Sequence, residues 1–174
     1  MQALKMQFLD IFRIGSWINM HYLIDGHNLI PKLGLRLDSL DDEEALISRL
    51  LEFCRLRRAQ VEVFFDGAPA GQASIHKSGA VTAHFVRLGS SADAAIEAQL
   101  ARLAKGARNW TVVSSDGRVQ RAARAVHAGV LSSEEFTREV SRAQALLESN
   151  SKHEATLAPN EVEEWLDLFN HKKG

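Results

Sequence analysis

The chain has 174 residues, of which 45% are hydrophobic and 25% are charged, and its formal net charge is −1. This composition excludes disordered, collagen-like and low-complexity chains, and the near-zero charge excludes a generally basic nucleic-acid coat. The single cysteine, Cys54, excludes an internal disulfide and favours a reducing cytoplasm. It falls on the apolar face of a predicted helix and is expected in the core. No apolar run approaches the ~20 residues that span a bilayer.

The first 19 residues are apolar in part, but Asp10 and Arg13 interrupt them. They therefore lack the continuous apolar stretch of a signal peptide. Met20 immediately precedes the first apolar strand. We interpret residues 1–19 as a leader or an extra amphipathic segment, and we expect a domain over residues 20–148.

Strands and helices alternate along this domain. A first strand is predicted at 21–24, followed by a helix over 41–58, whose apolar residues recur at helical spacing. A second strand is predicted at 61–65. Residues 67–79 are small and polar and are interpreted as an exposed loop. A third strand follows at 81–86.

The second half of the domain continues the alternation, with a helix at 90–103, a strand at 110–113, a helix through 119–126 and a strand at 129–131. Ser132 or Ser133 then caps a last helix, and Glu135 stands at the capping-box position from Ser132. Alternating strands and helices predict an α/β fold with a mainly parallel central sheet and helices on both faces, in three layers.

Residues 149–159 are polar and are interpreted as a linker, and residues 160–174 are predicted to form an amphipathic helix. Its apolar face would consist of Val162, Trp165, Leu166 and Phe169. Two interpretations stay open. The helix folds back on its own domain, or it docks on a partner, either a second subunit in a homodimer or the ribosome.

Four aspartates occupy similar places, at or just after the ends of strands or in the first turn of a helix: Asp25, Asp66, Asp93 and Asp116. The carboxyl ends of parallel strands line the ligand crevice of such sheets, so these acids are expected to converge. Grouped carboxylates repel one another unless a cation is present, and hard oxygen ligands favour Mg²⁺ or Mn²⁺ over zinc. The alternative for each residue alone is a helix cap or a turn.

A set of motifs occurs in a characteristic order: residues 24–30 (IDGHNLI), 63–67 (VFFDG), 91–93 (SAD) and 112–116 (VVSSD). With them, the chain resembles the NYN domain of the PIN-like nuclease superfamily, in its YacP-like branch, over about residues 20–146. The resemblance implies a PIN-like fold and a magnesium-dependent endoribonuclease that acts on messenger RNA near the ribosome. Many NYN nucleases carry a further acid where this chain has Arg118, which leaves the number of metal ions open.

The family motifs match six positions of this chain. The acid and the amide of the first motif fall on Asp25 and Asn28, and the later acids fall on Asp66, Asp93 and Asp116, the last of them preceded by Ser115. Glu97 lies one helical turn after Asp93 and faces the same way.

Charge is unevenly distributed, because residues 49–124 hold 12 Lys or Arg against 6 Asp or Glu. Several of these cations are predicted to hold RNA phosphates: Lys77, Arg87, Arg118, Arg121 and Arg124. For the three arginines that recur every three residues, a solvated helix face is the alternative.

These observations predict metal-dependent hydrolysis of RNA in the cytoplasm. Asp25, Asp93 and Asp116 would be catalytic and would bind Mg²⁺ or Mn²⁺, with support from Asn28, Asp66, Glu97 and Ser115. One alternative is a non-catalytic RNA-binding or ribosome-associated module of the same fold. Another is a phosphatase-like hydrolase with Asp25 as nucleophile, in which His27 stands where such enzymes have a second Asp.

Overall fold

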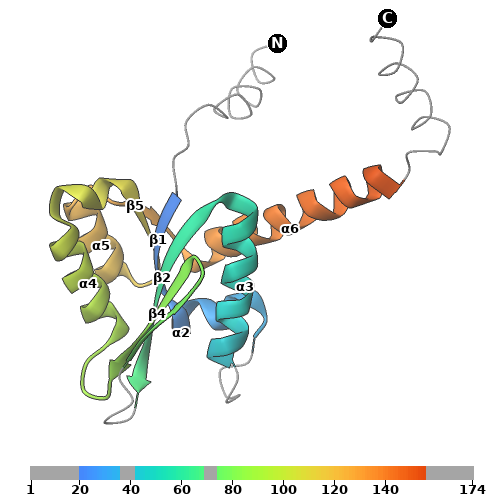
Figure 1. Ribbon diagram of the computed structural model, residues 1–174. Helices are drawn as coiled ribbons and strands as arrows, with labels where there is room; N and C mark the ends of the chain where they lie inside the picture. Colours follow the sequence, from blue (N-terminus) through green and yellow to red (C-terminus); the bar gives the residue numbers. More distant parts are fainter. Residues whose placement is uncertain (1–19, 36–41, 69–73, 156–174) are drawn as a thin grey trace, which may run out of the picture.

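The computed structural model describes residues 20–35, 42–68 and 74–155 (Figure 1). The leader predicted at 1–19 and the C-terminal helix predicted at 160–174 lie outside the described residues. The strands of the described part are β1 (Met20–Asp25), β2 (Ala59–Ala68), β3 (Ser74–Ser78), β4 (Val81–Arg87), β5 (Trp110–Val113) and β6 (Gly129–Leu131). The helices are α2 (Gly26–Leu29), η1 (Ile30–Leu33), α3 (Asp42–Arg57), α4 (Ala92–Leu103), η2 (Ala104–Asn109), α5 (Gly117–Ala125) and α6 (Ser133–Ala155).

The described strands form one sheet in the order β3-β4-β2-β1-β5-β6. All neighbours pair in parallel except β3 and β4, which are antiparallel. From β1 the chain builds outward through β2 to β4, and then crosses over to add β5 and β6 on the other side of β1. The strand order therefore reverses between β1 and β5. The α/β prediction with a mainly parallel sheet is confirmed.

Both faces of the sheet are buried, because side chains alternate between two cores. Tyr22 and Ile24 pack with α3 and α6 on one face, while Leu23 packs with α4 and α5 on the other. Figure 1 shows α4 and α5 on one side of the sheet and α3 on the opposite side. Cys54 is 3% exposed, as expected for a core residue, and burial raises the pKa of its thiol to about 11.

Three aromatic rings join β1 to the two helices that cover its first face. The ring of Phe53 meets Tyr22 edge-on at 5.7 Å and Phe136 at 5.0 Å, and Tyr22 meets Phe136 at 5.3 Å. Such edge-to-face pairs stabilise by about 0.5–1.5 kcal/mol each beyond the burial of their area. They hold α3 and α6 against the strand that ends in Asp25.

The interpretation of residues 67–79 as a loop is wrong in part, because residues 74–78 form the edge strand β3. Four of its five side chains are exposed, so the segment has no apolar alternation that would mark a strand. Its strand conformation comes from backbone pairing with β4. Ile75 is the one apolar side chain of this edge strand, and it is 68% exposed.

Helix ends follow the capping signals. The hydroxyl of Ser91 accepts a hydrogen bond from the N–H of Ala94 at 3.2 Å at the start of α4. At the start of α6, the N–H of Glu135 donates to the Ser132 hydroxyl at 3.1 Å, and the N–H of Ser132 donates to the Glu135 carboxylate at 2.8 Å. This is the predicted capping box. Helix α6 continues to Ala155, so residues 149–155 of the predicted linker are helical. Polar residues continue a helix where no Gly or Pro interrupts them.

In the part of the chain that the structure describes, no helix combines the length and the apolar character needed to cross a membrane.

Candidate metal-dependent active site

The four predicted aspartates come from the carboxyl end of the sheet. Asp25 is the last residue of β1, and Asp66 lies near the end of β2. Asp93 is in the first turn of α4, and Asp116 caps α5 just after β5. Open α/β sheets bind ligands beyond the carboxyl ends of the strands, at the point where the strand order reverses. Here that point lies beyond the ends of the paired strands β1 and β5, and we call it the gap. Asp25 and Asp116 stand on the two sides of this gap.

Asp25 is the most enclosed of these acids, at 8% exposed. One carboxylate oxygen accepts a hydrogen bond from the N–H of Asn28 at 3.2 Å, and the other lies 3.4 Å from the hydroxyl of Ser114. Burial, which is the largest cause, and the negative charges of Asp93 and Asp66 together raise the pKa of Asp25 to about 6, although the hydrogen bonds from Asn28 and Ser114 lower it. A nearby cation would stabilise the charged form of such a buried carboxylate.

Gly26 allows Asp25 to sit this deep. A Cβ at Gly26 would overlap the ring of Phe65 and lie 3.0 Å from the carbonyl oxygen of Phe64. The chain therefore turns directly from β1 into α2 against the neighbouring strand β2. The glycine of the IDGHN motif is required by this close approach.

The charge of Asp116, at the start of α5, acts on Asp93 in the first turn of α4. Burial raises the pKa of Asp93, the charge of Asp116 raises it further, and the Arg118 guanidinium opposes both. Asp116 also caps α5, because its Oδ1 accepts from the N–H groups of Arg118 at 2.7 Å and Val119 at 3.2 Å. Asp116 is thus both a helix cap and a member of the acidic group.

Asp66 stands at the outer side of the group and pairs with His27. The Nδ1 atom of His27 lies 2.6 Å from Asp66 Oδ1, and its Nε2 atom lies 3.4 Å from the carboxylate of Glu43. The pairing register of β2 shifts between Phe65 and Ala68, and Gly67 has a φ of +81° there. The bulge turns Asp66 toward α2. From the sequence, His27 was noted only as a departure from a phosphatase pattern. Its position between Asp25 and Asn28 was the signal that could have identified it as a residue of the site.

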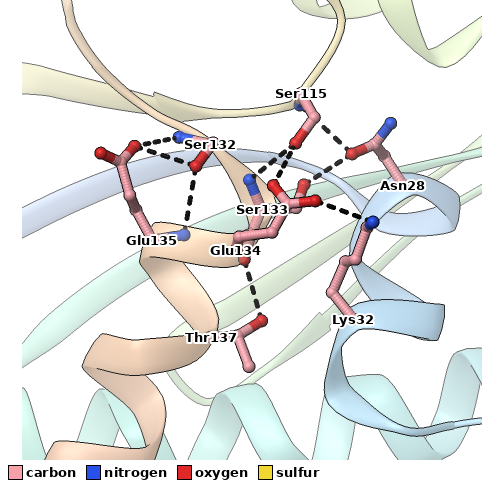
Figure 2. A network of polar contacts seen from close by, with 8 residues as sticks. All are labelled: Asn28, Lys32, Ser115, Ser132, Ser133, Glu134, Glu135 and Thr137. Atoms are coloured by element: carbon pink, nitrogen blue, oxygen red, sulfur yellow. Dashed lines mark hydrogen bonds and ion pairs between the residues drawn. The ribbon is translucent and has the colours of Figure 1, made fainter.

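Asn28 ties the first strand to the last two elements of the site (Figure 2). Its side-chain oxygen accepts from the N–H of Ser115 at 3.2 Å and from the hydroxyl of Ser133 at 2.6 Å. The Ser115 hydroxyl accepts from the N–H of Ser133 at 3.1 Å and donates to Glu134 at 2.8 Å. Glu134 in turn pairs with Lys32 at 2.7 Å. Sequence reasoning named neither Lys32 nor Glu134, since polar residues at helix ends carry no distinctive pattern.

A second hydroxyl links the two sides of the gap more directly. Ser114 is fully buried, and its hydroxyl faces Asp25 while accepting a hydrogen bond from the N–H of Asp116 at 3.0 Å. The side chain of Gln120 donates to the carbonyl oxygen of Ser114 at 2.8 Å. The loop from β5 to α5 is therefore held at every peptide from Ser114 to Asp116.

The predicted basic residues separate into groups. The Arg118 guanidinium donates two hydrogen bonds to Glu97, at 2.8 and 2.9 Å, so these two predicted site residues pair with each other. Arg121 and Arg124 are exposed on α5, and Arg87 is exposed at the end of β4, on the same edge of the sheet as Asp66. Lys77 pairs in register with Thr82 near the start of β4. With Gln60, Glu62 and Trp110 it lines a hollow of about 100 Å³ at the opposite end of the sheet from Asp25 and Asp66.

The donor chemistry of the group fits a hard divalent cation, because its members are carboxylates and the charges of their neighbours raise the pKa values of Asp25 and Asp93. Among the described residues, however, no three Asp, Glu, His or Cys side chains are close enough to coordinate one metal ion together. Mg²⁺ usually keeps several waters and binds through one or two carboxylates. The site thus fits an ion bound partly through water.

Comparison with known proteins agrees with the fold. A family model described as the YacP-like NYN domain matches residues 22–172. The chain is similar to a crystal structure of a single-residue mutant of Rae1 (YacP) from Bacillus subtilis, with 26% identity, a TM-score of 0.65, and coverage of 80% of this chain and 85% of that one. A second Rae1 (YacP) structure from the same organism has 25% identity and a TM-score of 0.62, and the coverage is 86% and 91%. No curated protein sequence matches significantly. The chain belongs to the YacP-like NYN domain family, and its domain is of a nuclease type.

Proposed function

We propose that the protein is a metal-dependent endoribonuclease that hydrolyses phosphodiester bonds of RNA beside the carboxyl ends of β1 and β5. The observation that carries the proposal is the position of Asp25, Asp93 and Asp116 near the point where the strand order reverses. The charge of Asp93 raises the pKa of Asp25, which is about 6, and the charge of Asp116 raises the pKa of Asp93. Carboxylates held together in this way are arranged for a cation that also neutralises a phosphoryl group.

Asp25, Asp93 and Asp116 would hold Mg²⁺ or Mn²⁺, in part through water. The ion, when bound, would polarise the phosphodiester and favour attack by water. Asn28 turns its amide NH₂ group away from Ser115 and Ser133 and so offers hydrogen-bond donors to a phosphate oxygen. Arg121, Arg124 and Arg87 offer exposed cations for neighbouring phosphates. RNA that lies across the edge would then meet donors on both sides of the acids.

The test is cleavage of an end-labelled single-stranded RNA by the purified full-length chain, with Mg²⁺, with Mn²⁺ and with EDTA. We expect metal-dependent internal cleavage that leaves 5′-phosphate and 3′-hydroxyl ends. Asp25→Asn and Asp116→Asn should abolish it, and Asn at position 116 keeps a good helix cap, so the fold survives. Glu44→Gln, at an exposed position of α3, is the matched control. Full activity of both Asn variants, or activity in EDTA, would contradict the proposal.

A second candidate function is a non-catalytic RNA-binding module of the same fold. One observation that favours it is the spacing of the acids, since no three acidic, His or Cys side chains of the described residues are close enough to coordinate one ion together. The other is the pairing of Arg118 with Glu97, which neutralises an acid beside the aspartates. RNA binding without cleavage in either metal would support it. On either function, the family resemblance favours messenger RNA at the ribosome as the target. Co-sedimentation of the chain with ribosomes tests this part separately.

A further inference from the structure

Glu134 joins two segments that are far apart in the chain (Figure 2). Its Oε1 atom lies 2.7 Å from the ammonium of Lys32 in η1, and its Oε2 atom accepts from the hydroxyl of Ser115 at 2.8 Å. Glu134 itself is in the first turn of α6. Its hydrogen bonds with Lys32 and Ser115 lower the pKa of the carboxyl to about 2, so it is charged at neutral pH.

The contact with Glu134 determines how Ser115 is held. A hydroxyl has one hydrogen to donate, and Ser115 donates it to Glu134. The hydroxyl oxygen is then left to accept the N–H of Ser133 at 3.1 Å, while the N–H of Ser115 donates to Asn28. Ser115 therefore has a defined partner for each group, and the direction of its hydroxyl depends on the Glu134 carboxylate.

Ser115 is followed directly by Asp116, the acid on the β5 side of the site. The N–H of Asp116 is already fixed by the Ser114 hydroxyl at 3.0 Å, and its carboxylate is fixed by the first turn of α5. The peptide between Ser115 and Asp116 is thus anchored from one end by Ser114 and from the other by the contacts of Ser115. A shift of Ser115 would be transmitted to the Asp116 carboxylate.

We propose that Glu134, braced by Lys32, is a positioning residue that holds the Ser115–Asp116 peptide in place for the reaction. This rests on the proposed function. Its role differs from that of a metal ligand, because its two oxygens contact Lys32 and Ser115. Groups that orient ligands in this way typically change activity by about 10–100-fold when they are removed.

The experiment compares Glu134→Ala, Glu134→Gln and Glu44→Ala in the full-length chain. Glu44 is a good control because it is also an exposed acid in the first turn of a helix, α3, so both changes remove a similar helix-dipole effect. We expect Glu134→Ala to lower kcat for RNA cleavage by about tenfold while KM changes less than about twofold. Glu134→Gln keeps an acceptor for Ser115 and should restore most of kcat. Glu44→Ala should leave kcat unchanged.

Hydrogen exchange of the amides of residues 115–117, measured without RNA or metal, gives a readout that does not need activity. We expect faster exchange there in Glu134→Ala than in Glu44→Ala. If the wild type does not cleave RNA, the proposed function fails, and the exchange comparison still tests the positioning role. Unchanged exchange in Glu134→Ala, or an equal loss of kcat in Glu134→Ala and Glu134→Gln, would overturn the proposal.

Discussion

The side-chain carbonyl oxygen of Asn28 accepts a hydrogen bond from the backbone N–H of Ser115 at 3.2 Å, although 87 positions separate the two residues in sequence. A backbone N–H only donates, so the contact fixes which end of the amide faces Ser115. The nitrogen of Asn28 points away from Ser115 and Ser133 in Figure 2. Asn28 therefore presents hydrogen-bond donors, and not its carbonyl oxygen, to a ligand at the edge of the sheet.

Asn28→Ala is expected to destabilise the fold, because it removes the shared acceptor of Ser115 and the fully buried Ser133. Leaving such donors without a partner costs about 1–3 kcal/mol. Urea unfolding of the variant and the wild type measures the difference. Asn109→Ala, at an exposed position of η2, is the control and should change the free energy of unfolding by less than about 0.5 kcal/mol. Equal stability of the two variants would show that the Asn28 contacts contribute nothing.

The raised pKa of Asp25 predicts a specific pH dependence of stability. The folded protein binds the Asp25 proton more tightly than the unfolded chain, whose ordinary value is 3.8 against about 6. The contribution of this group to the free energy of unfolding therefore falls as pH rises from about 4 to about 6, and is level above that range. A shift of ~2 pKa units corresponds to ~3 kcal/mol.

Asp25→Asn, which is isosteric and uncharged, should therefore be more stable than the wild type at pH 7 in EDTA, by up to ~3 kcal/mol. The advantage should shrink as the pH is lowered toward 4. Urea unfolding of both proteins at several pH values measures it, with Glu44→Gln as a control that should follow the wild type. A less stable Asn variant at pH 7 would mean that the charge of Asp25 is compensated within the fold.

Gly26→Ala is expected to destabilise the fold by about 1–3 kcal/mol, because the added methyl group overlaps the Phe65 ring and approaches the backbone of Phe64. The displaced ring should also disturb His27, which meets Phe65 edge-on at 5.7 Å. Thermal unfolding measures the loss. Gly106→Ala is the control, since nothing lies within 4 Å of the added Cβ there. A Tm for Gly26→Ala equal to that of Gly106→Ala would contradict the close packing.

The position of the cations predicts which of them bind RNA. Arg121→Gln and Arg124→Gln should each weaken RNA binding and reduce the slope of log K against log salt by about 0.7–1, as expected for one lost phosphate contact. Lys77→Gln should leave binding unchanged, because Lys77 lies at the opposite end of the sheet from the acids. Fluorescence anisotropy with a labelled single-stranded RNA at several salt concentrations gives both quantities. A larger effect of Lys77→Gln would move the RNA to the other end of the sheet.

The main strands and long helices could be predicted from sequence. Strands that are buried on both faces require continuous apolar runs, and helices that pack on the sheet require apolar residues at helical spacing. The edge strand β3 could not be predicted, since its exposed side chains are under no such constraint. Helix α2 was also missed, because its four residues are too few to show a period. Asp25, which precedes Gly26, nevertheless indicated a cap or a turn at this point, because Asp is a favoured residue at the start of a helix.

The position of the aspartates at the carboxyl end of the sheet was predictable from topology alone, because parallel strands place their carboxyl ends together. The partners of these side chains were not. Arg118 was expected to hold an RNA phosphate, but it pairs with Glu97. Lys77 was also expected to hold an RNA phosphate, but it lies at the far end of the sheet from the aspartates. Contacts such as Asn28 with Ser133 or Lys32 with Glu134 join residues more than a hundred positions apart, and nothing in the local pattern encodes them.

The central place of β1 between β2 and β5 links the site to the order in which the chain becomes available for folding. A chain that ends before Trp110 already contains Asp25, Asp66 and Asp93, together with β1, β2, β3 and β4. It has no strand on the other side of β1, and neither the Ser114 hydroxyl nor Asp116 to complete the gap. The acids would remain exposed at an unfinished sheet edge. The proposed cleavage would therefore require the chain to extend through β5 and the start of α5.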